Sequence, residues 1–158
     1  MITLGLDENN VMESPEEPCD VAWYDFTSNP GFGSNAVFIG HVNWYNLGSQ
    51  GCRCDSPGGC GGAGPAVFRY LKDLVRGDLI EVRLQDGTVY QYRVTAREQV
   101  DPDTADISSI VGPTEKEVLT RITCGGPFDF STRHYSERVV IRAERISDGP
   151  APGAVAHP

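Results

Sequence analysis

The sequence contains no long run of apolar residues, and none of its runs approaches the ~18 that a membrane-spanning helix needs. Its first residues, Met1–Leu6, lack both the basic start and the long apolar stretch of a secretory signal. Basic residues are few, 13 against 22 acidic ones, and Arg53 is the first of them. The chain as given is therefore expected to carry no membrane span or leader. Without a basic face it is not expected to bind nucleic acid.

Length and composition predict one packed domain with polar ends. A chain of 158 residues can bury a sufficient core without metals or disulfides. We expect a polar, acidic N-terminal arm over residues 1–20 and a packed domain over 21–146. Residues 147–158 are rich in Gly, Pro and Ala and are expected to be a disordered tail, which removes His157 from consideration. Within the packed domain, residues 47–64 are rich in Gly and Cys and are typical of an inserted loop.

The five cysteines divide into four and one. Cys52, Cys54 and Cys60 lie close together, Cys19 is far upstream, and Cys124 stands alone. Two disulfides among the first four would suit an oxidising, exported setting, whereas a reducing cytosol would favour a four-thiolate zinc site. Their C-x-C-x5-C spacing differs from the C-x2-C knuckles of structural zinc sites, so disulfides are favoured and zinc remains the alternative.

Short apolar segments separated by glycine-rich turns predict a mostly β protein. Most of the segments alternate apolar and polar residues, and an Asp86–Gly87 turn joins two of them into a hairpin. The expected strands are 36–39, 80–84, 90–94, 118–124 and 138–146. One short helix is expected over 66–74 and a helical turn around 106–110. This pattern favours a closed, mostly antiparallel β-barrel.

Three side chains at strand ends form a candidate catalytic set. Cys124 ends a strand and is followed by Gly125 and Gly126, which would open the backbone to another molecule. His41 follows another strand and could supply the acid and base that thiol chemistry requires. Arg138 begins the next strand and could stabilise an oxyanion. A structural histidine and an ordinary exposed arginine remain the alternatives.

These residues resemble the sortase family. Thr120–Cys124 is similar to its T-L-x-T-C signature, Ile39–His41 to its histidine motif, and Arg138–Ala143 to its arginine strand. The order His, Cys, Arg and a hairpin opened by Gly77–Asp78 also match, so the resemblance extends from about Trp23 to Ile146. The surroundings of the three residues are most similar to class F sortases of Gram-positive bacteria, with class E next.

The resemblance implies a closed eight-stranded β-barrel with one or two short helices, and makes 21–146 the catalytic domain. It implies a cysteine transpeptidase that cuts an LPxTG-like sorting signal, holds the acyl group as a thioester and transfers it to an amine. Cys124 would be the nucleophile, His41 the general acid and base, and Arg138 the oxyanion or substrate-carbonyl donor. Thr123 and Ile110 would contact the substrate.

The resemblance also implies partners and a location. The partners would be the sorting signals of surface proteins and an amine acceptor, either a cell-wall precursor or a pilin lysine. Sortases work at the outer face of the cell membrane, usually held by an N-terminal helix, and such an anchor is expected to be missing from the chain as given. No cofactor and no metal site are expected.

Three departures from the family pattern stand out. Arg121 replaces the usual leucine of the signature, Asn43 stands where close relatives often have Asp, and the cysteine-bearing insertion follows His41 directly. Two alternatives remain open: a hydrolytic cysteine peptidase of the same fold, and a non-enzymatic binding module braced by disulfides or zinc. An L,D-transpeptidase is set aside because Cys124 follows Ile122–Thr123 and not a Ser-His-Gly motif.

Overall fold

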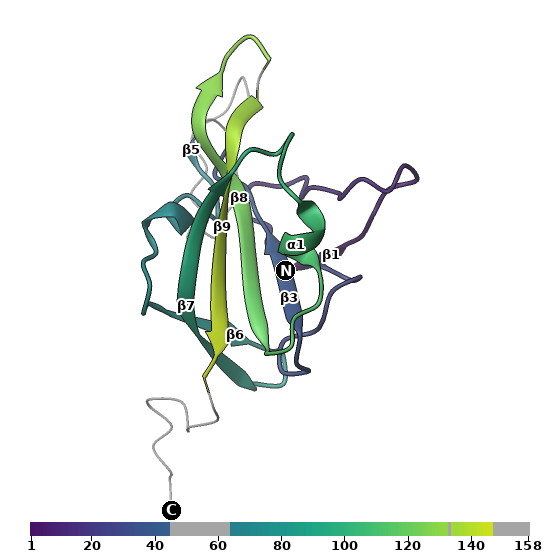
Figure 1. Cartoon of the computed structure of the whole chain (residues 1–158), viewed down its shortest axis with the longest axis vertical. Helices are drawn as coiled ribbons and strands as arrows, with labels where there is room; N and C mark the ends of the chain where they lie inside the picture. The colour runs from purple at the N-terminus through teal and green to yellow at the C-terminus, as the bar shows by residue number, and fades with distance from the viewer. Residues whose placement is uncertain (45–63, 133, 147–158) are drawn as a thin grey trace, which may run out of the picture.

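The computed structural model describes residues 1–44, 64–132 and 134–146 (Figure 1). Nearly all of the inserted loop, with Cys52, Cys54 and Cys60, and the whole tail, with His157, lie outside these described residues. The elements are β1 (Ile2–Leu4), β2 (Ala22–Tyr24), β3 (Asn35–Ile39), β4 (Asn43–Trp44), β5 (Gly64–Pro65), η1 (Leu71–Asp73), β6 (Leu79–Arg83), β7 (Val89–Val100), α1 (Ile107–Val111), β8 (Val118–Asp129) and β9 (His134–Arg145).

Seven of the strands form one curled sheet in the order β1-β2-β3-β8-β9-β7-β6, and β4 pairs with β5 separately. The prediction of a mostly β fold is confirmed. The closed eight-stranded barrel is not what the structure shows, because the sheet is an open half-barrel with β1 and β6 at its edges in the described part of the chain. β1 and β2, at one edge of the sheet, are only three residues long. The space inside the curled sheet is therefore occupied by side chains and is not closed by strand pairing.

The predicted helix over 66–74 is wrong, since the segment forms turns and the single 3-10 turn of η1. Its first amides bond to neighbouring segments: Ala66 N donates to Val42 O at 3.2 Å and Phe68 N to His41 O at 2.9 Å. The side chains of Phe68 and Leu71 nevertheless reach the core, as the apolar spacing required. Tertiary hydrogen bonds therefore override the helical pattern in the backbone, while the burial of Phe68 and Leu71 follows that pattern.

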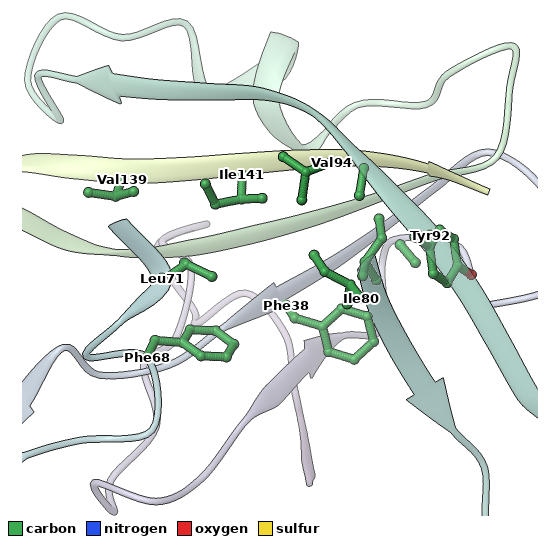
Figure 2. Close-up of a cluster of buried hydrophobic side chains, with 11 residues drawn as sticks. Phe38, Phe68, Leu71, Ile80, Tyr92, Val94, Val139 and Ile141 are labelled. Atoms are coloured by element: carbon green, nitrogen blue, oxygen red, sulfur yellow. The ribbon is translucent and has the colours of Figure 1, made fainter. Parts of the chain in front are cut away.

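Two apolar clusters cover the two faces of the sheet. On the inner face Phe68 and Leu71 approach Val139 and Ile141 of β9 (Figure 2). Val140, which lies between Val139 and Ile141 in the sequence, belongs to the cluster on the outer face. The alternation predicted for the last strand is confirmed. Arg138 stands two residues before Val140 and therefore lies on the outer face as well.

The predicted helical turn around residue 106 is confirmed as α1, which covers the outer face. The Asp106 side chain caps it by accepting from Ser108 N at 3.1 Å. Asn35, which is buried in β3, donates to Ile110 O at 3.0 Å and accepts from the Thr120 hydroxyl at 2.7 Å. These buried bonds hold α1 against β3 and β8.

Arg121, the departure from the family signature, points to the inner face. It pairs with Phe38 across β3 and β8, and its guanidinium lies 5.7 Å from the centroid of the Phe68 ring. Burial lowers the pKa of Arg121 to about 10. The charge is therefore held at a cost in free energy, on the face opposite Cys124.

We expect Arg121→Leu to raise the free energy of unfolding by about 1 kcal/mol or more, because an apolar side chain removes the desolvation cost of the charge. The measurement is urea unfolding at neutral pH. Arg83→Gln is the matched control, since Arg83 lines the same small inner pocket but is exposed and should change stability by less than about 0.5 kcal/mol. A loss of stability in Arg121→Leu would show that the charge is compensated.

Candidate active site

The parallel pairing of β3 and β8 brings His41 and Cys124 to the same end of these two neighbouring strands. Ile39, the last residue of β3, pairs with Ile122 of β8. His41 follows Ile39 by two residues, and Cys124 follows Ile122 by two residues. Two bonds extend the junction past the strand pair: Gly40 N donates to Ile122 O at 3.3 Å, and the Thr123 hydroxyl donates to Gly40 O at 2.7 Å. Residues 83 positions apart in the chain are therefore neighbours.

The residue before His41 must be glycine because of close packing. A Cβ atom on Gly40 would lie 2.8 Å from side-chain atoms of Val67 and Phe68. The bond from Phe68 N to His41 O then holds the histidine backbone on the same segment. This close approach fixes where the histidine leaves the strand.

The His41 ring contacts the N-terminal segment. Its Nε2 lies 2.6 Å from Pro15 O, and the ring is half-buried. A backbone carbonyl accepts only, so Nε2 carries the proton, and in the neutral ring Nδ1 carries the lone pair. Sequence reasoning missed this contact because a main-chain carbonyl leaves no mark on residue identity.

Cys124 is a half-buried free thiol whose Cα pairs with that of Arg138 across β8 and β9. Burial raises the pKa of Cys124, and the positive charge of Arg138 opposes part of that rise. Arg138 is the group that favours ionisation of the thiol.

The expectation that the strand stops at the two glycines is wrong, because β8 continues to Asp129 with an irregular register between Gly125 and Phe128. A Cβ on Gly125 would lie 2.6 Å from the Val139 side chain, and Gly126 has a φ of 71°. The glycines therefore serve the packing and bending of a long hairpin.

Arg138 leans back along its own strand. Its Nη1 donates to Glu137 O at 3.2 Å and to Tyr135 O at 3.5 Å. A guanidinium has five N–H donors, so further donors remain for a bound carbonyl or oxyanion.

A groove of about 440 Å³ lies on the outer face next to these residues. Its walls come from the N-terminal segment around Val11 and Met12, from α1 with Ile110, and from β3, β8 and β9. Arg138 is the one charged side chain in the lining that the structure describes. The groove thus offers a mainly apolar lining that includes one cation.

The two residues expected to contact substrate are placed differently. Ile110 lines the groove. Thr123 is 2 % exposed, and its hydroxyl is used in the bond to Gly40 O. Thr123 points away from the Cys124 face and stabilises the junction that carries the histidine.

Cys19 is disulfide-bonded, so it is not a thiolate ligand, and its link favours the disulfide alternative over zinc. Over residues 1–44, 64–132 and 134–146 no three His, Cys, Asp or Glu side chains gather as metal ligands would. Within the same ranges no helix has the length and apolar character to cross a membrane.

A family model described as a sortase domain matches residues 2–146. The fold is similar to that of a lid mutant of sortase A from Corynebacterium diphtheriae, with a TM-score of 0.62 and 20% identity over 93% of this chain and 70% of that one. It is also similar to the sortase D5 transpeptidase of Clostridium perfringens, with a TM-score of 0.54 and 20% identity over 80% of this chain. Of that second protein, the chain spans only 62%. No curated protein has a matching sequence.

Proposed function

The chain belongs to the sortase family, and on that premise we propose that it is a cysteine transpeptidase whose catalytic residues are Cys124, His41 and Arg138. The observation that carries the proposal is the junction of β3 and β8, where His41 and Cys124 lie at the same end of two paired strands. The groove lined by Arg138 lies beside this junction. A nucleophile, an acid and base, and a cation beside a groove are the parts that acyl transfer requires.

The reaction proceeds in two halves. The Cys124 thiol gives its proton to His41, the resulting thiolate attacks the scissile carbonyl, and Arg138 donates hydrogen bonds to the oxyanion that develops. The tetrahedral intermediate collapses, the C–N bond breaks, and His41 gives a proton to the leaving amine. An amine acceptor then gives up a proton to His41 as it attacks the thioester, and the Cys124 thiolate leaves.

The groove suits an extended peptide with apolar residues. Its lining is mainly aliphatic and includes Ile122, two residues before Cys124, and Arg138, which pairs with Cys124. An LPxTG-like sorting signal has such residues before the bond between Thr and Gly, and Ile110 would contact one of them. We propose class F, with class E next, as the subgroup, a cell-wall precursor or pilin lysine as the acceptor, and the outer face of the cell membrane as the location.

The test is intact-protein mass spectrometry after incubation with a small panel of LPxTG-like peptides. We expect a mass increase equal to the acyl fragment, mapped to Cys124 by peptide analysis. Adding an amine such as triglycine should replace the adduct by a peptide–amine product. Cleavage without that product would indicate a hydrolytic cysteine peptidase. Absence of both adduct and cleavage across the panel would contradict the proposal and leave a binding module.

A further inference from the structure

Two side-chain hydrogen bonds meet at Asn43, and one of them joins the segment after His41 to the first residues of β9, the strand that carries Arg138. Asn43, two residues after the histidine, donates through Nδ2 to the Tyr135 hydroxyl at 2.7 Å. Arg69 donates through Nη1 to Asn43 Oδ1 at 2.8 Å. All three side chains are partly buried, where hydrogen bonds are stronger than in open solvent. Asn43 therefore uses both its donor and its acceptor.

Tyr135 continues this connection to the site. Its main-chain carbonyl is an acceptor for Arg138 Nη1, three residues along β9. The hydroxyl end of Tyr135 is bonded to Asn43, beside His41, and its backbone end is bonded to Arg138. The series Arg69, Asn43, Tyr135 and Arg138 is referred to below as the brace.

The hairpin needs such a connection because its own pairing is irregular here. The register of β8 against β9 shifts between Gly125 and Phe128, so Tyr135, opposite Phe128, lies beyond the shift. The paired ends of β8 and β9 extend past the other strands (Figure 1). The regular ladder fixes the Arg138 backbone opposite Cys124 and Val100, whereas Tyr135, whose carbonyl accepts from the Arg138 guanidinium, lies beyond the irregularity. The Asn43–Tyr135 bond links this part of β9 to the segment after His41.

We propose that Asn43 and Tyr135 are positioning residues, which hold Arg138 in place beside Cys124 relative to His41. This inference rests on the proposed function for its effect on turnover. The effect of the two residues on the ionisation of the Cys124 thiol can be measured without any sorting peptide. Neither residue touches the reacting atoms; each acts through the Arg138 guanidinium.

The brace makes a specific demand on the side chain at position 43. Asn43→Leu keeps the size and loses both bonds, and Tyr135→Phe loses the hydroxyl alone. Asn43→Asp keeps both bonds, because a carboxylate accepts from Arg69 and the phenol can rotate to donate. Arg69 would also neutralise the added charge. The conservative variant should therefore behave as the wild type does.

The experiment measures the pH dependence of Cys124 alkylation by iodoacetamide, quantified on the Cys124 peptide by mass spectrometry. Among the residues that the structure describes, the charged or titratable groups nearest the thiol along the paired strands are Arg138 on β9, Glu137 opposite Gly125, and His41 after β3. If the brace holds Arg138 in place, Tyr135→Phe and Asn43→Leu lose part of its favourable charge effect. Their alkylation midpoints should move to higher pH, while Asn43→Asp stays at the wild-type value.

Tyr92→Phe is the matched control. It also removes a tyrosine hydroxyl bond, 2.7 Å from Glu117 Oε1, but Tyr92 pairs with Arg145 near the other end of β9. Its stability should fall like that of Tyr135→Phe without any change in the alkylation midpoint. Thermal unfolding confirms that each variant is folded at the assay temperature.

Turnover of a sorting peptide supplies the second readout. We expect kcat to fall about tenfold or more in Tyr135→Phe and Asn43→Leu with little change in KM, because misplaced catalytic groups cost rate more than binding. Unchanged alkylation midpoints in both variants, or an equal change in Tyr92→Phe, would overturn the brace. Failure of the wild type to turn over any peptide would refute the proposed function, while alkylation would still test the brace.

Discussion

Replacing Cys124 with alanine is expected to abolish cleavage of a sorting peptide, with a loss of at least about 10³-fold in kcat and no acyl adduct. The thiol supplies the bond that holds the acyl group, and no neighbouring residue can form the same thioester. Single-turnover cleavage followed by chromatography measures the rate, and mass spectrometry measures the adduct.

Peptide binding is the control for this variant. The groove walls are formed by other residues, with Ile110 and Met12 among them. Cys124→Ala should therefore bind the peptide about as tightly as the wild type, within about threefold, as measured by fluorescence titration. Cleavage by the alanine variant at a rate near that of the wild type would refute the role of Cys124 as the nucleophile.

Replacing Arg138 with methionine is expected to lower the acylation rate by about 10²–10³-fold, since a positioned donor to the oxyanion is lost. It should also shift the pH dependence in a defined direction. The Arg138 charge opposes the rise that burial causes in the pKa of Cys124. Without that charge the pKa rises further, so the ascending limb of the rate against pH moves to higher pH.

Arg142→Met is the matched control for this prediction. Arg142 lies four residues further along β9, on the same face as Arg138, and donates to Ser109 O at 2.8 Å on the surface. Its loss should change neither the rate nor the ascending limb. Arg138→Lys should restore part of the limb through its charge but less of the rate, because lysine lacks the planar fork. Equal losses in Arg138→Met and Arg142→Met would refute the role given to Arg138.

Local patterns predicted much of the candidate site. The buried run at 36–39 gave the strand that ends before His41, and alternation in 138–146 placed Arg138 opposite Val139 and Ile141. The Asp86–Gly87 turn appears between β6 and β7, with Gly87 at a φ of 89°. Each of these features depends on residues near one another in the chain, which is why period and turn chemistry are sufficient.

Contacts between distant segments could not be predicted in this way. The carbonyl of Pro15 meets the His41 ring, and Asn43 meets Tyr135, through atoms that no local pattern distinguishes. The segment after Ala66 follows a helical pattern, yet its amides bond to Val42 and His41. Whether the sheet closes likewise depends on tertiary packing, because the short strands at its edge and the core side chains compete for the space inside the curled sheet.

The sequence by itself determined the β-rich class, the order of His41, Cys124 and Arg138, and the family they resemble, because residue type and spacing carry that information along the chain. Only the tertiary structure decided that Thr123 stabilises the strand junction, that Arg121 lies on the inner face, and that the sheet stays open. These outcomes depend on which atoms from distant segments compete for the same space and the same hydrogen-bonding partners.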